Sequence, residues 1–220
     1  MEGWDSEFAL QILPELWRGM LSIVRSTLGG ISIAMTLGLV LAIARRSEIK
    51  LISWPVTAFI EFIRSTPLLI QLFFMFFALP SLGIVMSPVT TLVLGLGVHY
   101  ATYASEAYRA GIDAVDKGQW EATVALNMAP WTTWTRVILP QAIPKVLPAL
   151  GNFFVAMFKD APLGSTISVI GVLFVANAIG ARTFNFVEPF TVAGLLFLAV
   201  SVPASMFVRY LEKRYGYESA

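Results

Sequence analysis

Few side chains in this chain could do catalytic chemistry. It has one histidine, His99, and no cysteine. Thiolate sites, cysteine nucleophiles and multi-histidine metal centres are therefore excluded, and no catalytic or metal-ligating residue is predicted. His99 and Ser105 are the one candidate pairing of a base with a hydroxyl nucleophile. Their spacing of six residues puts them on different faces of one helix, which disfavours an enzyme.

Arg64 and Thr66 stand just before Pro67, at the edge of a long apolar stretch. Proline frees a backbone carbonyl, and such helix breaks line cavities when they occur inside a membrane. An arginine at this point suits the carboxylate of a zwitterionic solute, so Arg64 and Thr66 are candidate solute contacts. The alternative is that Arg64 pairs with Glu61, three residues earlier on the same helix.

A second candidate group contains Asn152, Lys159 and Asp160. Asn152 shares a helical stripe with Lys159 or Asp160, by the spacing of seven or eight residues. Lys159 and Asp160 lie about 100° apart on a helix, so at least one of them needs a partner elsewhere. The stripe is either the wall of a solute pathway or a subunit-packing face held by hydrogen bonds. His99 is interpreted as a packing histidine rather than a proton relay.

Membrane helices are the elements that would position these side chains. A transmembrane helix needs about 20 apolar residues, and Ser26–Ala44 is 19 residues without a formal charge. Ser65–Ser105 is 41 residues without one when His99 is neutral, and a turn is expected from Pro80 to Gly83. The predicted spans are 20–44, 54–79, 86–107, 146–169 and 189–209. The fourth is interrupted by Pro162, Gly164 and Gly171.

The composition agrees with an all-α membrane protein. Hydrophobic residues make up 57% of the chain and charged residues 13%, against about 25% charged residues in soluble domains. The polar sequence cannot cover five apolar helices, so membrane lipid is an expected partner. The net charge of +1 provides no basic field for nucleic acid. An intramembrane enzyme and a channel or structural membrane protein are the alternative classes.

Lysine and arginine in the loops predict the orientation. Ten lie in the first loop, the third loop and the C-terminal tail, whereas Arg18 and Arg182 are the two on the other side. The N-terminus is therefore expected outside and the C-terminus in the cytoplasm. This divides the chain into an extracytoplasmic segment (1–19), a membrane domain (20–210) and a cytoplasmic tail (211–220).

Residues 108–145 form the one long polar stretch and should have a role beyond connecting two spans. A short helix is predicted over Gln119–Leu126, ended by Asn127 in the left-handed conformation. Pro130 can open a second short helix, with Trp131 and Trp134 on its apolar stripe. Three prolines, at 140, 144 and 148, are expected to stop it. The segment either lies in the lipid headgroups or docks into a groove of a soluble partner.

This segment resembles the EAA loop of bacterial ABC importer permeases. Glu121-Ala122-Thr123, Asn127 and Val137-Ile138-Leu139-Pro140 keep the spacing of that pattern. Thr123, Asn127 and Val137 replace its alanine, glycine and isoleucine. Asparagine is a physical substitute for a left-handed glycine, so the turn should be preserved.

The rest of the chain is similar to the polar amino-acid uptake branch of these permeases. Arg64 to Phe74 (RSTPLLIQLFF) resembles RGTPLLVQLFF, and Lys159 to Leu163 (KDAPL) resembles KDTSL. GLGVHYATYASEAYRAGI and VILPQAIPKVLPAL look most like ectoine or hydroxyectoine permease subunits. Arginine, glutamine, glutamate and histidine permeases share most of these motifs.

The resemblance implies a type I ABC importer permease with five transmembrane helices in the bacterial inner membrane. It would work with two separate ATP-binding cassette subunits, a second permease that is identical or paralogous, and an extracytoplasmic solute-binding protein. No phosphate-binding loop is present in the sequence, so ATP would be used by the partner subunits and this chain would bind no cofactor. The resemblance assigns the coupling role to Glu121, Ala122, Asn127, Trp131, Trp134, Leu139 and Pro140.

Overall fold

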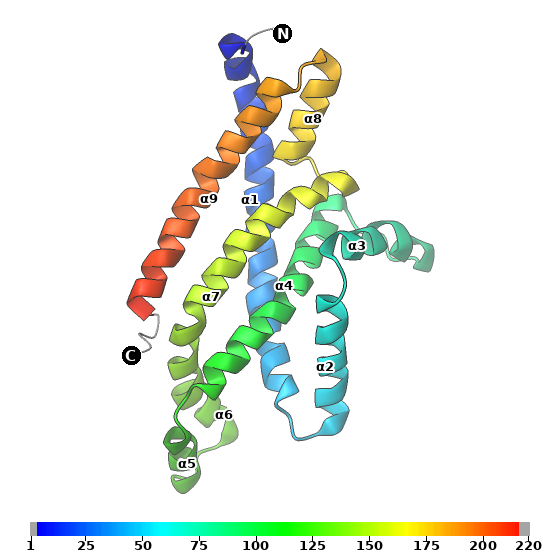
Figure 1. The fold of residues 1–220 in the computed structure, drawn as a ribbon. Coiled ribbons are helices and arrows are strands. Elements are labelled where there is room, and N and C mark those ends of the chain that lie inside the picture. The colour runs from blue at the N-terminus through cyan, green and yellow to red at the C-terminus, as the bar shows by residue number, and fades with distance from the viewer. Residues whose placement is uncertain (1–3, 216–220) are drawn as a thin grey trace.

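The computed structural model describes residues 4–215, and all of its regular elements are helical (Figure 1). Its long helices are α1 (Ser6–Arg45), α2 (Lys50–Arg64), α4 (Pro88–Asp113), α7 (Leu139–Asp160) and α9 (Val187–Tyr215). The shorter α-helices are α3 (Leu68–Phe73), α5 (Lys117–Ala125), α6 (Pro130–Thr132) and α8 (Val172–Thr183). Tighter or wider helical turns form η1 (Phe74–Ala78), η2 (Leu79–Leu82), η3 (Thr133–Ile138) and η4 (Ala161–Ile167).

The long helices form an elongated bundle in which the chain runs back and forth (Figure 1). The beginning of α1 and the α8–α9 connection lie toward one end, and the α1–α2 connection, α5 and α6 lie at the other. Within the described residues, three helical stretches are long and apolar enough to cross a membrane: Ser6–Arg45, Pro130–Ile167 and Val187–Arg214. A fourth is added if Lys50–Arg64 and Leu68–Leu82 together make one span.

The predicted span 54–79 is not one continuous helix but a helix pair broken at Pro67, where the sequence predicts a proline break. The chain bends by 104° between Lys50–Arg64 and Leu68–Leu82. Pro67 has an extended backbone, with φ −61° and ψ 138°. It supplies no N–H and pushes the preceding residue out of the helical region. The chain therefore turns here, and α3 with η1 and η2 forms an arm that leaves the bundle sideways (Figure 1).

The prediction that Pro140, Pro144 and Pro148 end the helix that begins at Pro130 was wrong. η3 leads directly into α7, which contains Pro144 and Pro148 in its interior and Pro140 in its first turn. The three prolines are four residues apart and share one face, so the lost N–H groups are confined to one side of α7.

Two predicted interruptions are confirmed. The chain turns at Gly83, whose φ of 81° lies in the left-handed region that glycine adopts without strain. The fourth predicted span is interrupted after Asp160, where α7 gives way to the tighter η4 turns that contain Pro162 and Gly164. Ser168 ends η4 with a left-handed φ of 65°.

The bundle depends on close packing of α1 against α4. Gly30, Ala34 and Gly38 follow one another at intervals of four residues along α1. A Cβ atom at Gly38 would lie 2.7 Å from the Cβ of Ala104 and 2.9 Å from the carbonyl oxygen of Ala101. Small residues let two backbones approach this closely, as in membrane helix pairs.

Candidate functional site

The turn after α5 is a Schellman motif centred on Asn127. Asn127 has a φ of 49°, so the predicted left-handed conformation is confirmed. Its N–H donates to the Val124 carbonyl at 2.9 Å, and the Met128 N–H donates to the Thr123 carbonyl at 3.0 Å. These two bonds satisfy carbonyls that a helix end otherwise leaves open. The turn therefore fixes the angle between α5 and α6.

Trp120 and Trp134 anchor this segment to the bundle. Their ring centroids are 5.3 Å apart in an edge-to-face arrangement, and both rings pack against a buried cluster. The cluster contains Ile112, Val115, Ile138 and Ala142. The guanidinium carbon of Arg46 lies 5.8 Å from the centre of the Trp120 ring. Trp134 is thus an internal packing residue that joins η3 and α5 to the ends of α4 and α1.

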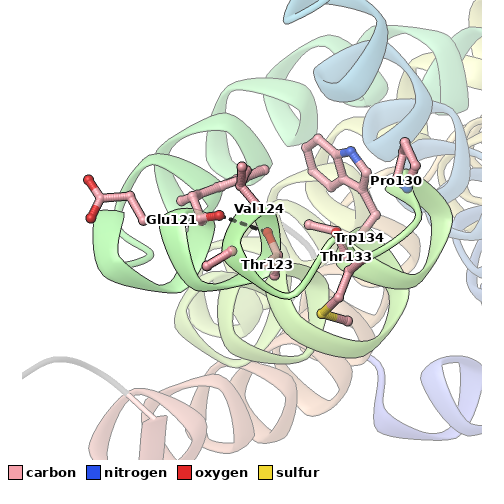
Figure 2. A pocket seen from close by; sticks show the side chains of 9 residues that line it. Glu121, Thr123, Val124, Pro130, Thr133 and Trp134 are labelled. Atoms are coloured by element: carbon pink, nitrogen blue, oxygen red, sulfur yellow. Dashed lines mark hydrogen bonds between the residues drawn. The ribbon is translucent and has the colours of Figure 1, made fainter.

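The opposite side of the segment is an exposed apolar edge beside an acidic residue. Val124, Leu126 and Trp131 are 79%, 74% and 79% exposed. Glu121 and Ala122 are exposed next to them, and Figure 2 shows the Glu121 side chain projecting away from the neighbouring helices. Among the side chains of residues 4–214, Glu121 makes no ion pair with Arg136 or any other residue.

A hollow of about 630 Å³ separates the exposed edge from the anchored side. Its lining comes from α5, the turn and η3, with Glu121, Thr123, Val124, Pro130, Thr133 and Trp134 labelled in Figure 2. Leu139 is half-buried and Pro140 exposed where α7 begins. Apart from Trp134, the residues assigned to coupling by resemblance therefore lie at or near an accessible surface.

A four-residue charge cluster lies where α1, α2 and α4 meet. Glu106 pairs with Arg45, with Arg64 at 3.6 Å and with Arg109 at 2.9 Å. The alternative pairing of Arg64 with Glu61 is wrong, because Glu61 lies 4.0 Å from Arg45 instead. The Arg64 guanidinium also stacks over the Tyr103 ring at 5.3 Å. The Glu106–Arg109 contact has the three-residue spacing of a pair on one helix, whereas the contacts of Glu106 with Arg45 and Arg64 join separate helices and have no spacing that would indicate them.

Thr66 contacts a residue that the sequence interpretation missed. The amide nitrogen of Gln71 donates to the Thr66 hydroxyl at 2.8 Å, and the other end of the amide lies 3.2 Å from Nδ1 of His99. Ser105 donates to the Thr102 carbonyl at 2.7 Å. His99 and Ser105 therefore bond to different groups and form no nucleophile–base pair. Gln71 is the one amide side chain between residues 65 and 105. Its isolation in this apolar stretch is a sequence feature that could have indicated it as a candidate site residue.

The stripe on α7 serves two different neighbours. Tyr100 donates a hydrogen bond to Asp160 at 2.7 Å, which ties α7 to α4. Asn152 donates to Glu212 at 2.9 Å, which ties α7 to α9. Lys159 is exposed and has no ion pair within residues 4–214. Over the same range, no three His, Asp or Glu side chains converge as metal ligands would.

The long apolar helices define an all-helical membrane protein, and its anchored segment α5–η3 presents an exposed apolar edge. Residues 34–217 match the family described as binding-protein-dependent transport system inner membrane components, so the chain belongs to this family.

Its relatives are transporter permeases. A probable amino-acid ABC transporter permease of Sinorhizobium fredii is 42% identical over 95% of this chain and 93% of its own length. The L-cystine transport system permease of Bacillus subtilis is 37% identical over 78% of this chain and 74% of its own length. The crystal structure of an amino acid ABC transporter with histidines matches with a TM-score of 0.87 and 31% identity, over 97% of this chain and 100% of that one.

These findings confirm the resemblance to permease subunits of amino-acid ABC transporters. The fold is the all-helical one of an ABC importer permease, and the chain is a membrane protein. Its family consists of inner membrane components of binding-protein-dependent transport systems.

Proposed function

We propose that this chain is the translocating subunit of an ATP-driven importer for a polar amino acid or an amino-acid-like solute in the bacterial inner membrane. Two ATP-binding cassette subunits, a second permease that is identical or paralogous, and an extracytoplasmic solute-binding protein complete the transporter. ATP is used by the cassette subunits, and this chain binds no cofactor. Ectoine is one candidate solute beside arginine, glutamine, glutamate, histidine and cystine.

The proposed topology has five passages, with the N-terminus outside and the C-terminus in the cytoplasm. Its support is the alternating direction of α1, the α2–α3 pair, α4, α7 and α9 (Figure 1). The α1–α2 connection lies at the same end as α5 and α6. The residues around that connection and the segment 108–145 carry seven of the 15 lysines and arginines of the chain: Arg45, Arg46, Lys50, Arg109, Lys117, Arg136 and Lys145. The positive-inside rule places that end in the cytoplasm.

One observation carries the coupling proposal: the exposed edge of Val124, Leu126 and Trp131 beside Glu121, on an anchored turn. A cluster of large apolar side chains with an unpaired charge is typical of a protein-docking surface. A helix lying in lipid headgroups would carry lysine and arginine on its polar face, whereas α5 has Lys117 alone. The Trp120–Trp134 anchor would then transmit motion of the docked ATPase to α4 and α7 as a rigid unit.

The proposed solute pathway runs past Arg64, Thr66, Asn152, Lys159 and Asp160. Lys159 and Asn152 are exposed, and Arg64 and Asp160 are partly exposed, in a bundle of predominantly apolar helices. Charged groups inside a bilayer cost at least about 2.5 kcal/mol each. These side chains therefore face a water-filled pathway or a second subunit rather than lipid.

The decisive variant is Glu121→Arg in the assembled transporter, with uptake of a radiolabelled solute panel into vesicles as the readout. The charge reversal should lower ATP-driven uptake at least about tenfold, equivalent to about 1.4 kcal/mol of lost coupling, while membrane insertion is unchanged. The control variant is Glu7→Arg, in the first turn of α1 and at the opposite end of the bundle from Glu121. It should transport normally. Normal uptake by Glu121→Arg would refute the coupling role.

A further inference from the structure

One side chain, Gln71, forms hydrogen bonds on both sides of the bend between α2 and α3. Its amide nitrogen lies 2.8 Å from the Ile63 carbonyl, 3.0 Å from the Thr66 carbonyl and 2.8 Å from the Thr66 hydroxyl. The last carbonyls of a helix have no intrahelical donor. The Ile63 carbonyl accepts from the Thr66 N–H and hydroxyl next to it, and Gln71 adds a donor to it from the far side of the bend, where Pro67 has no N–H.

The same amide connects the bend to α4. The oxygen of Gln71 lies 3.2 Å from Nδ1 of His99. Because the amide nitrogen points to the bend, the oxygen faces the imidazole, so His99 Nδ1 is the donor in this contact. One side chain thus joins the end of α2, the break, α3 and α4.

Side chains do not fill the inner side of the bend, so α2 and the arm are not packed against each other there. A hollow of about 450 Å³ occupies the space between α2 and the arm, and its lining is almost entirely apolar. The residues that line it include Phe59, Phe62, Ile70, Phe74 and Met75. On the other side the arm is pressed close to α4, since a Cβ at Gly95 would lie 2.5 Å from Cδ2 of Leu72. The arm therefore contacts α4 on consecutive turns, through Leu72 at Gly95 and Gln71 at His99.

The angle of the bend decides where the polar groups of the proposed pathway lie. Arg64 is the last residue of α2 and reaches Glu106 and Tyr103 on α4. Thr66 lies in the break itself and bonds to Gln71. We propose that Gln71 is a positioning residue of the transport pathway, which clasps the α2–α3 bend to His99 and thereby fixes Arg64 and Thr66. This inference rests on the proposed function.

The clasp is tested first by geometry, because the chain has no cysteine of its own. Spin labels on Leu51→Cys in α2 and Phe77→Cys in the arm, both exposed positions, report the bend angle by pulsed electron paramagnetic resonance in the assembled transporter. Gln71→Leu and His99→Leu should each at least double the width of the distance distribution. Gln11→Leu on α1, an exposed glutamine, is the matched control and should leave it unchanged.

The second readout is the number of solute molecules imported per ATP hydrolysed, with labelled L-arginine, L-glutamine, L-cystine and ectoine as probes. Each single variant should lower this ratio several-fold, the double variant should be no worse than either, and the exchange Gln71→His with His99→Gln should restore it. An unchanged ratio, proportional losses of uptake and ATPase activity, or multiplicative losses in the double variant would overturn the proposal. If the unmodified transporter imports none of the probes, the proposed function fails instead, and the distance measurement still decides whether the clasp exists.

Discussion

Asn127 shows how one backbone angle shapes the proposed docking surface. Its φ of 49° lies in the left-handed region, which costs an ordinary L-residue about 1–2 kcal/mol. Asparagine tolerates this region and glycine is unstrained there. The hydrogen bonds from the Asn127 N–H to the Val124 carbonyl and from the Met128 N–H to the Thr123 carbonyl depend on that conformation.

Asn127→Val should therefore lower the free energy of unfolding by about 1–2 kcal/mol, because a β-branched side chain clashes in the left-handed region. Asn127→Gly should stay within about 0.5 kcal/mol of the parent chain. Unfolding in mixed detergent micelles, followed by tryptophan fluorescence, measures both. Equal stability of the valine and glycine variants would show that the turn does not constrain the segment.

Glu106 is the shared acceptor of three arginines, and its side chain is 23% exposed. Glu61, by comparison, is 57% exposed and reaches Arg45 only at 4.0 Å. Screening by solvent makes the second pair weak. Removing the partner of partly buried charges leaves those charges uncompensated.

Glu106→Gln should destabilise the chain by about 1–3 kcal/mol, less than the full loss of a buried pair because the site is partly solvated. Glu61→Gln is the control and should cost about 0–1 kcal/mol. Detergent unfolding of the two variants compares them directly. If they have the same stability, Glu106 does not hold α1, α2 and α4 together.

Among the elements, α1 and α4 approach each other closely along a seam that contains Gly30, Gly38 and Gly97. A Cβ added at Gly38 would lie 2.7 Å from the Cβ of Ala104. A Cβ added at Gly97 would lie 2.8 Å from the Cβ of Ile33. Neither neighbour has a long flexible side chain that could move aside. The helices would have to separate along the seam, with loss of packing.

Gly38→Ala should lower the unfolding free energy by about 1–3 kcal/mol, even though alanine is the better helix former. Gly194→Ala, on an exposed part of α9 where an added Cβ meets nothing within 4 Å, should raise it by up to about 1 kcal/mol. Thermal unfolding in detergent distinguishes the two signs. A stabilising effect at both positions would contradict the close approach of α1 and α4.

At the scale of the whole molecule, the proposed orientation puts Trp4 and α5 on opposite sides of the membrane. The bundle alone has no bilayer to define inside and outside, so the assignment depends on the distribution of lysine and arginine. The absence of cysteine makes the question accessible to labelling at single introduced positions.

Trp4→Cys should react with a membrane-impermeant maleimide on intact spheroplasts, whereas Val124→Cys and Lys213→Cys should react only after the membrane is opened. This pattern follows from an odd number of passages with the positive end inside. Labelling of Val124→Cys from the outside would reverse the topology. Labelling of Trp4→Cys and Lys213→Cys from the same side would require an even number of passages.

The sequence by itself determined the class of protein, because composition, charge-free runs and the spacing of Glu121, Asn127 and Leu139-Pro140 are local properties of the chain. It also determined the left-handed turn at Asn127 and the breaks near Gly83 and Pro162, since those follow from the backbone preferences of single residues. Only the tertiary structure decided which groups meet across helices: Glu106 with three arginines, Gln71 with His99, and Asp160 with Tyr100. It also decided that Pro67 bends the chain by 104° while Pro144 and Pro148 leave α7 continuous. A proline's effect depends on whether the surrounding helices replace the lost hydrogen bond, and that is settled by packing between residues far apart in the sequence.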